Sequence, residues 1–102
     1  MGVRIAMSEE SVTAYLAGEI DHHCARDIRE EIDETVQRAH PAELTLDFKD
    51  VTFMDSSGIG LVMGRYALMS EMDGKLHMAN LGTHIKKVMR LAGIDKLVAL
   101  EK

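Results

Sequence analysis

The chain has 102 residues, which fits a single domain spanning residues 1–102 and excludes a separate catalytic lobe. Twelve basic and 17 acidic residues give a formal net charge of −5 without any block of Lys and Arg, so neither nucleic acid nor a membrane is an expected partner. The single cysteine, Cys24, cannot form an internal disulfide, and the N-terminus lacks the apolar segment of a signal peptide. We therefore expect a soluble, unprocessed cytoplasmic protein.

The N-terminal part of the chain predicts a β-hairpin followed by an amphipathic helix. The apolar patterns of residues 3–7 and 12–16 predict two strands joined by a short turn. Asp21 is a candidate N-cap for the helix that follows, and Pro41 disfavours helical geometry at His40, where we expect that helix to end. The apolar face of this helix is formed by Ala25, Ile28, Ile32, Val36 and Ala39.

A third strand and an unusual helix come next. The strand is predicted by the alternation of Leu44, Leu46 and Phe48 with polar residues. Residues 57–72 predict a helix that is apolar nearly all round in its first half. It contains Gly58, Gly60 and Gly64, and each interior glycine costs a helix about 0.5 to 1 kcal/mol relative to alanine. Close packing, or close approach by another molecule, would explain this composition.

The C-terminal part predicts a strand, a helix and a final strand. Residues 75–80 predict a short strand, Thr83 is a candidate cap for the next helix, and Gly93 stands where a left-handed residue would end it. Residues 97–100 predict the last strand. The resulting order, β-β-α-β-α-β-α-β, indicates an α/β fold in which helices pack on one mixed β-sheet of about five strands.

Residues 53–58, with the sequence FMDSSG, place two hydroxyls and a carboxylate at the predicted junction between a strand and a helix. The first N–H groups of a helix lack intrahelical partners, so Asp55 or Ser56 could serve simply as an N-cap without further function. Apolar residues around the two serines, with glycines that bare the backbone, are instead typical of a docking surface. These apolar residues are Met54, Ile59, Leu61 and Met63.

A phosphoryl group on Ser56 would add about −1.5 to −2 charges at this junction. The helix N-terminus stabilises an anion by only about 0.3 to 1 kcal/mol, so phosphorylation should leave the fold intact. At a docked apolar interface beside Asp55, the same dianion would cost about 2 to 5 kcal/mol, which is on the order of 30- to 3,000-fold in affinity. Ser56 would therefore switch binding without switching the fold.

Three stretches of the chain resemble a known family: GEIDHH at 18–23, DFKDVTFMDSSGIGLVMGRY at 47–66 and AGIDKLV at 92–98. They are similar to the anti-sigma-factor antagonists of the STAS family, those of sporulation in particular. The resemblance implies a small mixed sheet with helices packed on it, and a regulatory protein without cofactor or catalytic residues. The implied partner is an anti-sigma factor that is also an ATP-dependent serine kinase. The unphosphorylated antagonist binds it and releases the sigma factor to activate transcription, and a serine phosphatase reverses the modification.

The resemblance also assigns roles to individual residues. Ser56 is the implied phosphoryl acceptor. The implied partner contacts surround it and comprise Glu19, Asp21, Met54, Asp55, Ser57, Gly58 and Ile59. An alternative is a STAS-type scaffold or ligand-sensing module that binds a nucleotide or another small molecule and is never phosphorylated. The sequence contains no P-loop-type glycine-rich cradle that would identify such a ligand.

Two further interpretations have less support in the sequence. A serine hydrolase would need a G-x-S-x-G elbow, an oxyanion segment and a placed histidine, whereas the local sequence is MDSSG. His22, His23 and Cys24 could be metal ligands, but adjacent helical positions point about 100° apart and do not converge on one ion. We therefore expect neither an enzyme nor a metal site.

Overall fold

The computed structural model describes residues 2–98 and begins with the predicted hairpin. Strand β1 (Gly2–Met7) pairs antiparallel with β2 (Ser11–Ile20), which extends beyond the predicted strand. Alternate residues of β2 turn to one face, because successive side chains of a strand point to opposite sides. The buried members of this set are Val12, Ala14, Leu16 and Ile20.

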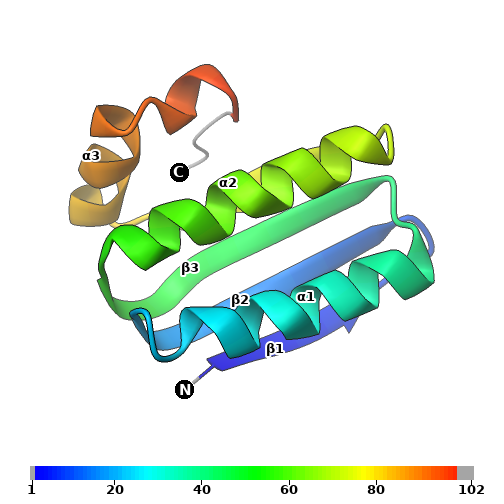
Figure 1. The fold of residues 1–102 in the computed structure, drawn as a ribbon, viewed down its shortest axis with the longest axis horizontal. Coiled ribbons are helices and arrows are strands. Elements are labelled where there is room, and N and C mark those ends of the chain that lie inside the picture. The colour runs from blue at the N-terminus through cyan, green and yellow to red at the C-terminus, as the bar shows by residue number, and fades with distance from the viewer. Residues whose placement is uncertain (1, 99–102) are drawn as a thin grey trace.

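A four-stranded mixed sheet forms the base of the molecule, in the spatial order β1-β2-β3-β4 (Figure 1). Strands β3 (Glu43–Met54) and β4 (Lys75–Ala79) continue the sheet in parallel with β2. Parallel neighbours need long crossover connections, and helices supply both of them here. The described residues therefore contain four strands rather than the approximately five predicted.

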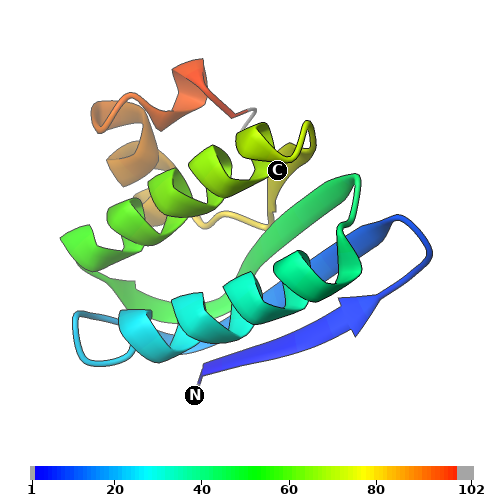
Figure 2. The same ribbon diagram turned by 45° about the vertical axis from the view of Figure 1, so that its right-hand side comes forward.

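Two helices lie side by side across one face of this sheet (Figures 1 and 2). Helix α1 (Ala25–Ala39) connects β2 to β3, and α2 (Ser56–Glu71) connects β3 to β4. As predicted, α1 ends at His40, which is left-handed (φ 49°) and donates its amide to the Val36 carbonyl oxygen over 2.8 Å. The helices bury Ile28, Ile32, Val36, Leu61, Val62 and Met69 against Leu44, Leu46 and Phe48 of the sheet.

The last elements of the described residues differ from the prediction. Helix α3 (Thr83–Leu91) has Gly82 rather than Thr83 at its N-cap, and Gly93 adopts the expected left-handed conformation (φ 81°). A short 3-10 helix, η1 (Ile94–Lys96), follows Gly93, and residues 97 and 98 then form a turn rather than the start of the predicted last strand. The amides of Leu97 and Val98 both donate to the Ile94 carbonyl oxygen over 2.9 Å.

The physical reason for this correction is the spacing of the buried side chains. Ile94 and Val98 are 0% and 4% exposed, while Leu97 is 43% exposed. Apolar residues four apart share one face of a helical turn, whereas a strand would bury alternate residues. The prediction of a strand over 97–100 is therefore wrong at residues 97 and 98, and its remainder lies outside the described residues. No helix among residues 2–98 is long and apolar enough to span a membrane.

Candidate functional site

The carboxyl ends of β2 and β3 meet at the start of α2. Glu19 is paired with Phe53, and Ile20 with Met54, in the parallel register. The Asp55 amide continues this contact by donating to the Ile20 carbonyl oxygen over 3.1 Å. The loop after β2, where Glu19 and Ile20 end the strand, therefore lies beside the junction that leads into α2.

Asp55 is the N-cap of α2. Its backbone is extended (φ −100°, ψ −166°), and its Oδ1 accepts a 2.7 Å hydrogen bond from the Ser57 amide. The Gly58 amide donates to the Asp55 carbonyl oxygen over 3.0 Å. Of the two capping candidates, Asp55 satisfies the exposed amide, and Ser56 becomes the first residue of the helix.

The exposure of the junction changes sharply from one residue to the next. Ser56 is exposed, Ser57 and Ile59 are half-buried, and Gly58 is buried. Nothing among residues 2–98 forms a hydrogen bond with the Ser56 hydroxyl. The local fold is therefore held by the neighbours of Ser56, while Ser56 itself is exposed at the positive end of the helix dipole.

The apolar rim expected around the serines is composed differently. Met54 and Leu61 are 8% and 4% exposed and belong to the core, so the expectation of an exposed rim at these positions is wrong. Of the other two expected rim residues, Ile59 is half-buried and Met63 is 42% exposed, while Phe53, directly before Met54 in β3, is 53% exposed.

The position of Phe53 follows from β3 itself. The register shifts twice where β3 pairs with β2, and each shift inserts one extra residue in β3. Two insertions restore the original alternation, so Met54 faces inward like Phe48 and Phe53 faces outward. The alternation of Leu44, Leu46 and Phe48 was the sequence signal that could have shown Met54 to be buried and Phe53 to be exposed.

Gly58 is required by close packing. A Cβ placed on Gly58 would overlap the Cγ and Sδ atoms of Met54, in the middle of that side chain. By contrast, a Cβ at Gly60 or Gly64 would meet nothing within 4 Å. Close packing thus explains one of the three glycines of this helix, and no neighbouring atom requires a glycine at the other two positions.

Asp21 stabilises a turn rather than the first residue of α1. Its Oδ1 accepts hydrogen bonds from the amides of His23 (3.0 Å) and Cys24 (3.1 Å), and α1 begins only at Ala25. The N-cap position is Cys24, so the prediction that Asp21 occupies it is wrong by one turn. The hydrogen bond from the Cys24 amide is the main cause of a lowered pKa for Asp21. Burial is the main cause of a raised pKa for the Cys24 thiol.

The metal and hydrolase interpretations gain no geometric support in the described part of the chain. The rings of His22 and His23 lie 4.0 Å apart between centroids, tilted by 37°. Within residues 2–98, no group of three or more His, Cys, Asp and Glu side chains is arranged to hold a metal ion. No hydrogen bond there joins a histidine to Ser56 or Ser57, as a Ser–His pair would require.

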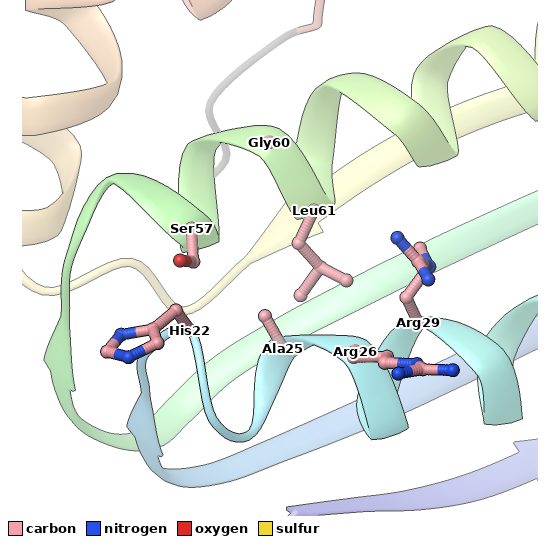
Figure 3. A pocket seen from close by; sticks show the side chains of 7 residues that line it. All are labelled: His22, Ala25, Arg26, Arg29, Ser57, Gly60 and Leu61. Atoms are coloured by element: carbon pink, nitrogen blue, oxygen red, sulfur yellow. The ribbon is translucent and has the colours of Figure 1, made fainter.

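A pocket of about 320 Å³ lies between the N-terminal parts of α1 and α2 (Figure 3). The Ser57 hydroxyl turns toward the loop that carries His22, and the Arg29 side chain extends from α1 toward α2. The lining residues are His22, Ala25, Arg26, Arg29, Ser57, Gly60 and Leu61. Sequence reasoning did not identify Arg26 and Arg29. Their spacing of three residues places them on one face of a helix, but it does not show which residues of the neighbouring helix complete the pocket.

A buried ion pair joins the two helices beside this pocket. Arg65 Nε of α2 lies 2.8 Å from Asp33 Oδ1 of α1, and the Arg65 side chain is 7% exposed. The two atoms are close but not aligned as a hydrogen bond, and Arg65 Nη1 has no hydrogen-bond partner in the described part of the chain. Burial raises the pKa of Asp33, opposed by the charges of Arg65 and Arg29, and burial lowers the pKa of Arg65.

The chain belongs to the STAS family, because the family model described as "Mlab, STAS domain" matches residues 3–99. An anti-sigma F factor antagonist of Paenibacillus polymyxa is 32% identical over 85 residues, which cover 83% of this chain and 73% of that protein. An anti-sigma-B factor antagonist of Bacillus subtilis is 26% identical over 98 residues, which cover 96% and 88%.

The fold is also that of a structurally known member. The anti-sigma factor antagonist SpoIIAA in its unphosphorylated form matches with a TM-score of 0.86 and 28% identity, over 99% of this chain and 88% of that chain. The phosphorylated form of SpoIIAA from Bacillus matches with a TM-score of 0.79 and 28% identity, over 99% and 91%. These similarities confirm both the family resemblance and the α/β fold predicted from the sequence.

Proposed function

We propose that this protein is an anti-sigma factor antagonist whose binding to its partner is switched off by phosphorylation of Ser56. The observation that carries the proposal is that Ser56 is exposed at the first position of α2, directly after the Asp55 cap. The names of the relatives support the antagonist role, since they act on anti-sigma F and anti-sigma-B factors. The existence of SpoIIAA in unphosphorylated and phosphorylated forms supports the modification.

The proposed partner is an anti-sigma factor that is also an ATP-dependent serine kinase. In the transfer step the Ser56 hydroxyl oxygen attacks the γ-phosphorus of ATP, the bond to the β-phosphate oxygen breaks, and ADP leaves. The hydroxyl proton passes to a base of the kinase. A serine phosphatase restores the hydroxyl by hydrolysis, and the cycle takes place in the cytoplasm, where the sigma factor acts.

The effect of the phosphate on the fold is small. The phosphate adds about −1.5 to −2 charges at the N-terminus of α2, where an anion is stabilised by about 0.3 to 1 kcal/mol. No buried contact is lost, because Ser56 is exposed and Asp55 rather than Ser56 caps the helix.

The effect of the phosphate on a docked partner is large. The Asp55 carboxylate, the exposed Glu19 side chain and the added dianion would all face the same partner surface. Desolvating a dianion without matching donors costs about 2 to 5 kcal/mol at an interface. Phosphorylation therefore ends binding while the antagonist stays folded.

The test compares Ser56→Ala, Ser56→Asp and the wild type for binding to the purified cognate anti-sigma factor. Ser56→Ala should bind and accept no phosphate, while Ser56→Asp should stay folded and bind at least tenfold more weakly. Ser70→Ala is the matched control, because Ser70 is an exposed serine near the other end of α2. Undiminished binding by Ser56→Asp, or its unfolding, would count against the switch. Saturable nucleotide binding by the isolated protein without phosphate transfer would favour the ligand-sensing alternative.

A further inference from the structure

The pocket between α1 and α2 carries an excess of positive charge. Arg29 of α1 and Arg65 of α2 both interact with the carboxylate of Asp33. Arg65 holds that carboxylate at 2.8 Å, and no ion pair to Arg29 forms among residues 2–98. One carboxylate thus faces two guanidinium groups, and the exposed Arg29 is the one that lines the pocket.

The rest of the lining adds to this charge. Arg26 also lines the pocket, and its ion pair with Glu30 (3.2 Å) joins two side chains that are 75% and 56% exposed. Such an exposed pair contributes little and can be exchanged for another partner. None of the residues that line the pocket is acidic. In a chain with a net charge of −5, this is a local basic site.

The pocket also opens beside the proposed acceptor. Ser57 and Gly60 line it from the N-terminal part of α2, and Ser56 is the direct neighbour of Ser57 (Figure 3). A partner large enough to cover Ser56 would also cover the pocket mouth. It would then remove Arg29 from water, which is costly unless the partner supplies an opposite charge.

We infer that the pocket receives an aspartate or glutamate side chain of the docked anti-sigma factor, with Arg29 as its principal partner and Arg26 as the second. The inference rests on the proposed function, because the occupant is a residue of the proposed partner. The pocket volume of about 320 Å³ accommodates a side chain of this size. A planar guanidinium also matches the two oxygens of a carboxylate.

This arrangement makes the docking site bipolar. Glu19 is exposed at the end of β2, beside the start of α2, and Arg29 lies along α1. A partner must therefore place a positive group against Glu19 and a negative group in the pocket. Opposite charges at two separate points fix the orientation of the complex and disfavour partners with another charge pattern.

The experiment measures the affinity of Arg29→Glu and Arg29→Gln for the purified cognate anti-sigma factor. Arg29→Glu should weaken binding about 10- to 100-fold, and Arg29→Gln by less. Arg38→Glu is the matched control, since it makes the same charge change on the exposed surface at the other end of α1. It should change the affinity less than about threefold. Thermal unfolding verifies that each variant is folded.

A reciprocal substitution identifies the occupant. One Asp→Lys or Glu→Lys change in the anti-sigma factor should restore binding to Arg29→Glu and weaken binding to the wild type. Equal affinities of Arg29→Glu and Arg38→Glu would overturn the inference. If the wild type binds, Ser56→Asp weakens binding and Arg29→Glu does not, the pocket assignment alone fails. If the folded wild type does not bind the anti-sigma factor, the proposed function fails and the pocket assignment fails with it.

Discussion

The Asp55 carboxylate accepts a 2.7 Å hydrogen bond from the amide of Ser57 and not from that of Ser56, the residue between them. Ser56 is consequently exposed at the first position of α2 without taking part in the cap. In the proposed switch, one residue therefore holds the start of the helix and the next residue carries the modification. The structural role of Asp55 can thus be tested apart from the role of Ser56.

Replacement of Asp55 by alanine should lower the free energy of unfolding by about 0.5 to 2 kcal/mol, because the Ser57 amide loses its acceptor. Asp55→Asn should cost less, since the asparagine side-chain oxygen also caps helices. Urea denaturation of the three proteins measures both differences. An asparagine variant as unstable as the alanine variant would show that the charge, rather than the cap, is what matters at this position.

Alanine at Gly58 should destabilise the protein by about 1 to 3 kcal/mol, because the new Cβ overlaps the middle of the Met54 side chain. Gly60→Ala provides the matched control on the same helix. It meets nothing within 4 Å and should stabilise the protein by about 0.5 to 1 kcal/mol through helix propensity. Chemical denaturation should therefore give opposite signs, and a Gly58→Ala variant as stable as the wild type would contradict the packing account.

Removal of the Asp33 carboxylate should be costly, because it leaves the Arg65 guanidinium buried without an opposite charge. We expect Asp33→Leu to lower the free energy of unfolding by about 3 kcal/mol. The double variant Asp33→Leu/Arg65→Met should recover much of this loss, since it removes both charges. A double variant no more stable than Asp33→Leu would show that the ion pair itself holds α1 against α2.

The Asp21 turn should make stability depend on acid pH. Hydrogen bonds from the Cys24 and His23 amides lower the pKa of Asp21 in the folded protein below its ordinary value of 3.8. The stability from this carboxylate is therefore fully present above the unfolded pKa and is lost as the pH falls through the lower folded-state pKa. The stability difference between the wild type and Asp21→Ala should shrink between pH 6 and about pH 3.

Asp27→Ala is the control for this pH dependence. Asp27 lies in the first turn of α1 but accepts neither of the two hydrogen bonds made to Asp21. Denaturation curves at several pH values measure the stability difference between the wild type and each variant. This difference should shrink toward acid pH for Asp21→Ala, and it should shrink less for Asp27→Ala. An Asp21→Ala difference that stays constant with pH would contradict the role given to the turn.

Local sequence signals predicted the elements whose positions are determined by their own residues. Pro41 and the apolar spacing of α1 predicted its end at His40, and alternation predicted the hairpin and the start of β3. The prediction of a last strand was wrong. It rested on composition, because Leu97 and Val98 are residues that suit a strand. Their backbone amides instead close a helical turn onto Ile94.

Only the part of the site that is contiguous in the sequence was predicted. The MDSSG motif identified the junction and the family, and Asp55 does lie at the N-cap. The basic pocket depends on Arg29 of α1 meeting Ser57 and Gly60 of α2, residues that no local pattern connects. The exposed position of Phe53 continues the alternation of Leu44, Leu46 and Phe48, because the two bulges between β2 and β3 together preserve it.

The central claim is that Ser56 accepts the phosphate that controls binding. The most direct measurement is intact-mass and phosphopeptide analysis of the full chain after incubation with the cognate anti-sigma factor and ATP. We expect one added phosphate, located on Ser56 and absent from Ser56→Ala. A phosphate on Ser57, or none at all with an anti-sigma factor of demonstrated kinase activity, would contradict the account.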